Sequence, residues 1–291
     1  MKFCCEQLDR SYPTRLVKPL TLLTHLRSFN LTTNNIKYNT QIAELKSDEA
    51  SSKVFNDRYE KLSMSLIFLH GSGCSSIVWE QQLSFFNNGL ALNLPGHPDG
   101  NALNDVSDLS EWLVNFIEKR NLSDVVLVGH SLGSAVALQT ALLGEVNVKA
   151  LVLIGAGARL KVIPQLLDSL AGLVESDGQI PDFLLSANQK IAEPLRTKIN
   201  SSIKENGASV MLNDFSACDK FDVMEHLADI NIPVQIIVGD KDQMTPLKYA
   251  LFLQNKLSKA ELKIVKGGTH MVFAEHPDLV NKTIQGFLTS I

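Results

Sequence analysis

A serine between closely spaced glycines is the first feature of this sequence that could do chemistry. Ser131 is the central residue of the Gly-His-Ser-Leu-Gly segment at 129–133. The apolar run at 125–128 precedes it, and residues 134–143 have the composition of a helix that ends at Gly144. A strand, a sharp turn and a helix are the setting of a G-x-S-x-G nucleophile elbow, in which the turn exposes the serine hydroxyl. We therefore predict that Ser131 is a nucleophile.

An acid and a histidine that could activate this serine follow it in the chain. The apolar segment 234–239 ends in Asp240 and Asp242, and the alternating segment 262–265 leads to His270. A serine hydroxyl is a weak nucleophile unless an imidazole takes its proton, and a carboxylate fixes the tautomer and charge of that imidazole. The order serine, acid, histidine differs from the orders in chymotrypsin-like and subtilisin-like proteases. His270 is the predicted base, and the acid is one of the two aspartates.

Donors for a developing oxyanion are expected after an earlier strand. Residues 66–69 are apolar and lead into a small, glycine-rich turn at 70–73. Such a turn can aim the N–H group of Ser72 at the oxyanion, and the N–H group of Leu132, directly after the nucleophile, would be the second donor. Side chains and glycines that would support the two turns are His70, Gly71, Gly73, Gly129 and Gly133.

These segments resemble the α/β-hydrolase fold family of the bacterial esterase and lipase type. The matching stretches are 69–73, 94–98, 129–133, 239–246 and 268–271, so the resemblance covers the chain from about Leu66 onward. The family pattern Gly-x-x-Asp-x-x-x-Pro fits Gly239, Asp242 and Pro246, which favours Asp242 as the acid. The resemblance implies catalysis without a metal or organic cofactor. One departure is visible, because the family often has Gly-His-Gly-x-Ser where this chain has Gly-His-Pro-Asp-Gly at 96–100.

The resemblance also predicts the organisation of the chain. An α/β core would comprise residues 31–157 and 227–291, with a mostly parallel central sheet flanked by helices and with leading antiparallel strands between 32 and 60. Residues 158–226 lack the strand–helix alternation and would be a helical cap inserted after the sixth strand. Residues 1–30 are a basic N-terminal extension. Ser107 is a candidate N-cap of a helix over 107–119, and His97, Asp99 and His130 are predicted to have structural roles.

Composition excludes several classes of function. The net charge is −4 and no basic patch is evident, which argues against nucleic-acid binding. No apolar run reaches the roughly 18 residues of a membrane span. The four cysteines lack a metal-ligand spacing, which favours a cytoplasmic protein, although Cys4 and Cys5 and the basic extension leave lipid anchoring or organelle targeting open. The oligomeric state stays open.

A serine at the elbow separates this chain from relatives that carry aspartate or cysteine there, namely haloalkane dehalogenases, epoxide hydrolases and dienelactone hydrolases. By resemblance, we expect a carboxylesterase that acts on small-molecule esters with short- to medium-chain acyl groups. The alternatives are a thioesterase, lactonase or acyltransferase using the same three residues, and a non-catalytic ligand-binding protein on the same fold.

Overall fold

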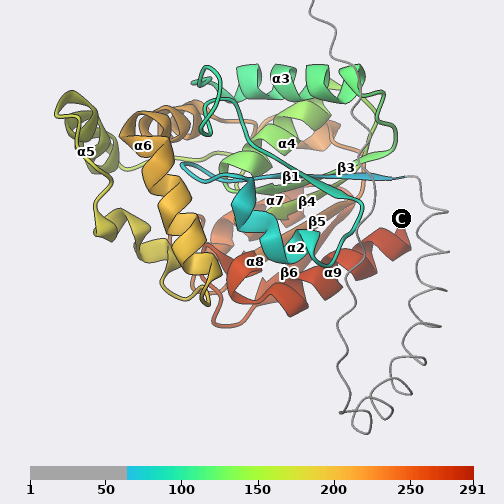
Figure 1. Cartoon of the computed structure of the whole chain (residues 1–291). Coiled ribbons are helices and arrows are strands. Elements are labelled where there is room, and N and C mark those ends of the chain that lie inside the picture. Colours follow the sequence, from blue (N-terminus) through green and yellow to red (C-terminus); the bar gives the residue numbers. More distant parts are fainter. Residues whose placement is uncertain (1–63) are drawn as a thin grey trace, which may run out of the picture. The chain divides into compact units, whose positions relative to one another are not determined.

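The computed structural model describes residues 64–291, and within them six parallel strands form one sheet (Figure 1). The order across the sheet is β2-β1-β3-β4-β5-β6. The predicted α/β-hydrolase sheet is thereby confirmed for this part of the chain. The predicted antiparallel strands between 32 and 60, and the N-terminal extension, lie outside the described residues. The strands are β1 (Ser65–Leu69), β2 (Gly89–Leu92), β3 (Val125–His130), β4 (Val148–Ile154), β5 (Val234–Gly239) and β6 (Ala260–Val265).

The strand register places the candidate catalytic segments at one edge of the sheet. Leu69 pairs with Gly129, and His130 pairs with Ile154, so the carboxyl ends of β1, β3 and β4 are level. The carboxyl ends of β5 and β6 meet where Gly239 pairs with Val265. Because ligands of parallel α/β sheets bind outside the carboxyl ends of the strands, this edge is the expected site of chemistry.

Alternating side chains of the buried strands form two apolar layers. Ile67 and Leu127 face one layer, whereas Phe68 and Val128 face the other. Helices α3, α4 and α7 cover the first face, and α2, α8 and α9 cover the second (Figure 1). The bounds are η1 (Ser76–Trp79), α2 (Glu80–Leu83), α3 (Val106–Lys119), α4 (Leu132–Leu143), η3 (Leu227–Asp229), α7 (Leu247–Lys256), α8 (Val272–Glu275) and α9 (Pro277–Ser290).

Two helix ends test the sequence predictions directly. Helix α4 ends as expected at Gly144, whose left-handed φ of 69° suits a residue without a side chain. The predicted cap of α3 is wrong: Asp105 is the N-cap, and its carboxylate accepts a hydrogen bond from the Ser107 N–H group at 2.9 Å. Ser107 is therefore inside the first turn, where its N–H group donates to the carboxylate of the N-cap residue.

Helices α5 (Pro164–Glu175) and α6 (Leu195–Lys220) and the short η2 (Asp182–Asn188) lie between β4 and β5. They occupy the segment predicted to be a helical cap, and Figure 1 shows α5 and α6 at the end of the sheet toward which β1 points. The sequence pattern predicts a helix over residues 191–203 in this segment. Helix α6 instead extends to Lys220 and is interrupted at Gly207, where φ is 80°. The insertion follows the fourth strand of the described part, so its expected place after a sixth strand depends on residues outside that part.

Candidate active site

Ser131 occupies a strained turn between β3 and α4. Its φ of 52° and ψ of −116° are unusual for a residue other than glycine. The turn is held because the Ser131 N–H group donates to the Ile154 carbonyl at 3.0 Å. The residue is 8% exposed and lines a cavity. The turn has the backbone conformation that a nucleophile elbow requires, and the catalytic role of Ser131 stays a prediction.

The two elbow glycines are required by close backbone contact. A Cβ atom on Gly129 would lie 2.3 Å from the Gly133 carbonyl oxygen, and one on Gly133 would lie 2.2 Å from the Leu69 carbonyl oxygen. Both distances are far below van der Waals contact, and both neighbours are backbone atoms. The glycines thus let β3, α4 and β1 approach each other closely enough to bring the serine beside the turn after β1.

The predicted base and acid are in direct contact. His270 Nδ1 lies 2.8 Å from Asp242 Oδ2, and both side chains are buried. The carboxylate can only accept, so Nδ1 carries the proton and Nε2 is the basic nitrogen. Thr245 donates its N–H group to Oδ1 of Asp242 and its hydroxyl to Oδ2. Burial raises the pKa of Asp242, but the bond and charge of His270 and the Thr245 bonds outweigh it and lower the pKa overall.

Asp240, the alternative acid, serves another contact. Its carboxylate accepts a hydrogen bond from the Gly267 N–H group at 2.7 Å and so joins the turns after β5 and β6. Of the two aspartates, Asp242 is the one that the structure places against His270.

The third contact expected of a triad, from Ser131 Oγ to His270 Nε2, is not among the hydrogen bonds of the structure. Nε2 of His270 is buried and has no hydrogen-bond partner within residues 64–291. Ser131 and His270 nevertheless line the same cavity. Catalytic hydrogen bonds are often long before substrate binds, so the arrangement is compatible with proton transfer once the serine approaches.

The turn after β1 carries Ser72, which lines the same cavity as Ser131. We use the name oxyanion loop for residues 71–74. The Ser72 N–H group donates to no other described residue, and Leu132 is the first residue of α4, whose first amides lack intrahelical acceptors. The predicted oxyanion donors are therefore available, next to the positive end of a helix dipole.

His70, predicted to support this loop, contacts it directly. Its Nε2 accepts a hydrogen bond from the Leu94 N–H group at 3.1 Å, and its Nδ1 donates to the Gly71 carbonyl at 2.9 Å. Burial, followed by the neighbouring charge of His97, lowers the pKa of His70 to about 3. His70 is thus a neutral bridge between the loop and the end of β2.

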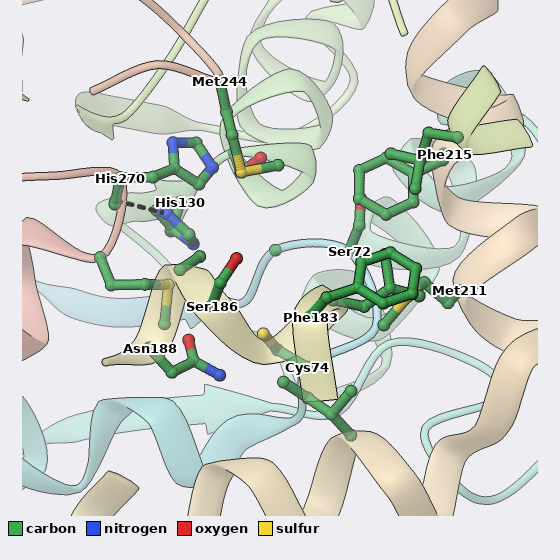
Figure 2. A pocket seen from close by; sticks show the side chains of 17 residues that line it. Ser72, Cys74, His130, Phe183, Ser186, Asn188, Met211, Phe215, Met244 and His270 are labelled. Atoms are coloured by element: carbon green, nitrogen blue, oxygen red, sulfur yellow. Dashed lines mark hydrogen bonds between the residues drawn. The ribbon is translucent and has the colours of Figure 1, made fainter. Parts of the chain in front are cut away.

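His130 packs beneath the candidate base. Its Nε2 donates to the His270 carbonyl at 3.0 Å (dashed line in Figure 2), and the two rings lie 4.6 Å apart. Burial, followed by the neighbouring His270, lowers the pKa of His130 well below its ordinary value. The ring is therefore neutral and orients the loop that carries His270.

Two apolar cavities border Ser131. One, of about 250 Å³, extends over the oxyanion loop and His270 (Figure 2). The second, of about 220 Å³, lies toward the segment after β4 and shares Leu166, Phe215 and Met244 with the first. Sequence reasoning identified none of these wall residues individually, because the helical spacing of the insertion does not reveal which apolar side chains face a cavity. The first cavity is also lined by Cys74, Phe183, Leu184, Ser186, Ala187, Asn188, Ile203, Met211 and Met271.

Two further features concern binding. Within residues 64–291, no cluster of three or more histidine, cysteine, aspartate or glutamate side chains could hold a metal ion. No helix of the same part combines the length and apolar character needed to cross a membrane.

Comparison with known proteins identifies the class to which this fold and site belong. Residues 66–283 match the model of the alpha/beta hydrolase family, and the chain belongs to that family. It is 26% identical over 257 residues to "Putative esterase/lipase 2" of Mycoplasma genitalium, with 82% of this chain and 94% of that protein covered.

A second relative is the pimeloyl-[acyl-carrier protein] methyl ester esterase of Pseudoalteromonas atlantica, 25% identical over 248 residues, covering 76% of this chain and 95% of that one. Among solved structures, a lipase-esterase related protein from Clostridium acetobutylicum superposes with a TM-score of 0.69 at 26% identity, covering 77% of this chain and 94% of that chain. These relatives support a hydrolase activity.

Proposed function

We propose that this protein is a serine hydrolase that cleaves carboxylic esters of short- to medium-chain acyl groups through an acyl-enzyme on Ser131. The observation that carries the proposal is the 2.8 Å contact of His270 with Asp242 beside the cavity that Ser131 lines. The esterase and lipase names of the relatives support the same reaction class.

In the first half of the reaction, Ser131 Oγ attacks the ester carbonyl carbon while His270 Nε2 takes the hydroxyl proton. The carbonyl oxygen becomes an oxyanion and accepts hydrogen bonds from the N–H groups of Ser72 and Leu132. The tetrahedral intermediate then breaks its bond to the alcohol oxygen, which leaves with the proton from His270. Asp242 stabilises the imidazolium formed between these steps without becoming protonated.

In the second half, water attacks the acyl-enzyme and gives its proton to His270. Collapse of the second tetrahedral intermediate releases the carboxylic acid and returns the proton to Ser131 Oγ. Each bond broken is replaced by a bond to oxygen, so the reaction needs no oxidant, reductant or metal ion.

The cavities favour small apolar acyl groups. At about 250 Å³, the larger of the two cavities lies just below the ~300–1,000 Å³ of typical ligand pockets. Its walls from α6 and η2 include Ile203, Met211 and Phe183. We therefore propose that residues 158–226 act as a cap that shapes the acyl site and shields it from water.

Hydrolysis of p-nitrophenyl esters from acetate to palmitate tests the proposal. Wild type should turn over the shorter members fastest, and Ser131→Ala should lose on the order of 10⁶-fold in kcat. Ser290→Ala, at the far end of α9, is the matched control and should retain wild-type rates. Folded wild-type protein without turnover of any ester, or Ser131→Ala with wild-type turnover, would contradict the proposal.

A further inference from the structure

Helix α6 of the insertion holds the backbone of the oxyanion loop. Asn206 donates its side-chain N–H groups to the carbonyls of Gly73 at 3.0 Å and Cys74 at 2.8 Å. Asp214 accepts a hydrogen bond from the Gly73 N–H group at 2.7 Å. Cys218, one helical turn further on, places its sulfur 3.5 Å from the Ser72 hydroxyl. Every residue from Ser72 to Cys74 is thus bonded to α6.

Asp214 also forms a buried ion pair with the loop that follows β2. Its Oδ2 lies 2.9 Å from Nε2 of His97, and both side chains are almost fully buried. His97 Nδ1 faces the carbonyl oxygens of Leu94 and Pro95 at 3.0 and 3.2 Å. All of these partners are acceptors, so both ring nitrogens carry protons and His97 is an imidazolium.

The surroundings of His97 agree with this charge. The ring of His70 lies 4.6 Å away and is neutral, so Asp214 is the charged group that faces His97. Burial lowers the pKa of His97, but the hydrogen bond and charge of Asp214 and the carbonyl bonds outweigh it and raise the pKa overall. Oδ2 of Asp214, on α6, therefore accepts hydrogen bonds from both the His97 cation and the Gly73 N–H group.

The loop also fits α6 sterically. Gly73 has a left-handed φ of 69°, and a Cβ atom there would lie 2.8 Å from the Met211 terminal methyl group. The same methionine lines the cavity above Ser131. Hydrogen bonds, charge and packing thus all tie the loop to one face of α6.

We propose that Asp214, paired with His97, is a positioning residue for the reaction: from α6 it fixes the oxyanion loop so that the Ser72 N–H group points at the developing oxyanion. The inference rests on the proposed function. Because Asp214 is on α6, the oxyanion hole would form only when α6 packs on the core. Substrate would therefore meet a preformed hole only when the insertion is in place.

The size of the effect follows from the geometry. Asp214 lines neither of the two cavities beside Ser131, so its loss should act through the loop. Without it, the Gly73 amide loses its acceptor and the buried His97 loses its counterion. A displacement of about 1 Å at a catalytic group can cost on the order of 100-fold in rate, whereas ground-state binding in the apolar cavity should change little.

The test compares Asp214→Ala and Asp214→Asn with wild type. Glu205→Gln is the matched control, because Glu205 is exposed on the same helix and the substitution removes the same negative charge. Two quantities are measured: kcat and KM for the p-nitrophenyl ester that wild type turns over fastest, and hydrogen–deuterium exchange of the segment containing Gly73. For Asp214→Ala we expect kcat to fall about 10- to 100-fold with KM changed less than about threefold, and faster exchange at Gly73.

Asp214→Asn retains an acceptor oxygen but no charge, so it should lie between Asp214→Ala and wild type, and Glu205→Gln should match wild type. If Asp214→Ala does not fold, Asp214→Asn decides. A kcat within about twofold of wild type, or a rise in KM at unchanged kcat, would overturn the inference. If wild type shows no ester turnover, the proposed function fails, and the exchange data alone then test the contact between Asp214 and the loop. Unchanged exchange at Gly73 in Asp214→Asn would overturn the inference.

Discussion

Gly133 lets the start of α4 pack closely against the end of β1, and its substitution by alanine gives a prediction that can be worked from distances. A Cβ atom there would lie 2.2 Å from the Leu69 carbonyl oxygen and 2.7 Å from that of His70. A Cβ atom essentially never lies within 3.0 Å of a non-bonded heavy atom, so the helix and strand must separate by at least 0.8 Å, the difference between 3.0 and 2.2 Å. The backbone atoms involved cannot rotate away.

The displaced elements carry Ser131 on one side and the oxyanion loop on the other. Misplacement of about 1 Å costs on the order of 100-fold in rate, so kcat/KM for Gly133→Ala should fall about 100-fold. Overpacking of a dense core costs about 1–3 kcal/mol, which in a domain of this size lowers Tm by about 2–12 °C.

The assay is steady-state ester hydrolysis together with thermal unfolding. Gly286→Ala is the control, because Gly286 is exposed in α9 and has no heavy atom within 4 Å of its Cβ position. That variant should gain about 0.5–1 kcal/mol of stability without a change in kcat/KM. Gly133→Ala with wild-type kcat/KM and Tm would refute the description of the elbow.

Two further predictions concern charge. Asp242→Asn should lose on the order of 10⁴-fold in kcat because the His270 tautomer is no longer fixed. Asp240→Asn should lower Tm yet keep kcat within about threefold, because within residues 64–291 the Asp240 carboxylate accepts a hydrogen bond only from a loop amide. The reverse ranking in a kinetic comparison would reassign the acid. The second is a pH dependence: the pKa of His97 is raised above 6.5, so the stability from its pairing with Asp214 is complete below that pH and is lost as pH rises through the folded-state pKa. Urea unfolding from about pH 6 to about pH 9 should show the gap between wild type and Asp214→Asn shrinking, and a constant gap would count against a charged His97.

The sequence predicts those parts of the molecule that depend on local pattern. The strands and the elbow at Ser131 were predictable because apolar runs, glycines and turns lie next to each other in the chain. A histidine and an acid at one place were predictable because both segments follow strands, and parallel strands bring such ends to one edge. The contact of His270 with Asp242 at 2.8 Å is the structural expression of that rule. The choice of Asp242 over Asp240 came from the family pattern.

Other parts depend on contacts that leave no local signal. The bond between Gly73 and Asp214 spans 141 residues, and nothing near Asp214 in the chain distinguishes it from a surface aspartate. Helix α6 was underestimated because Gly207 and the polar residues around it resemble the end of a helix. The N-cap of α3 was misassigned because Asp105 and Ser107 are both good caps, and only the backbone geometry separates them.

The proposed mechanism requires that Ser131 is the activated nucleophile. Reaction of the folded protein with a fluorophosphonate, followed by mass spectrometry of its peptides, can identify that residue. We expect one covalent adduct on the peptide that contains Ser131, absent from Ser131→Ala and formed much more slowly in His270→Ala. An adduct on a different residue, or no adduct on folded wild-type protein, would contradict it.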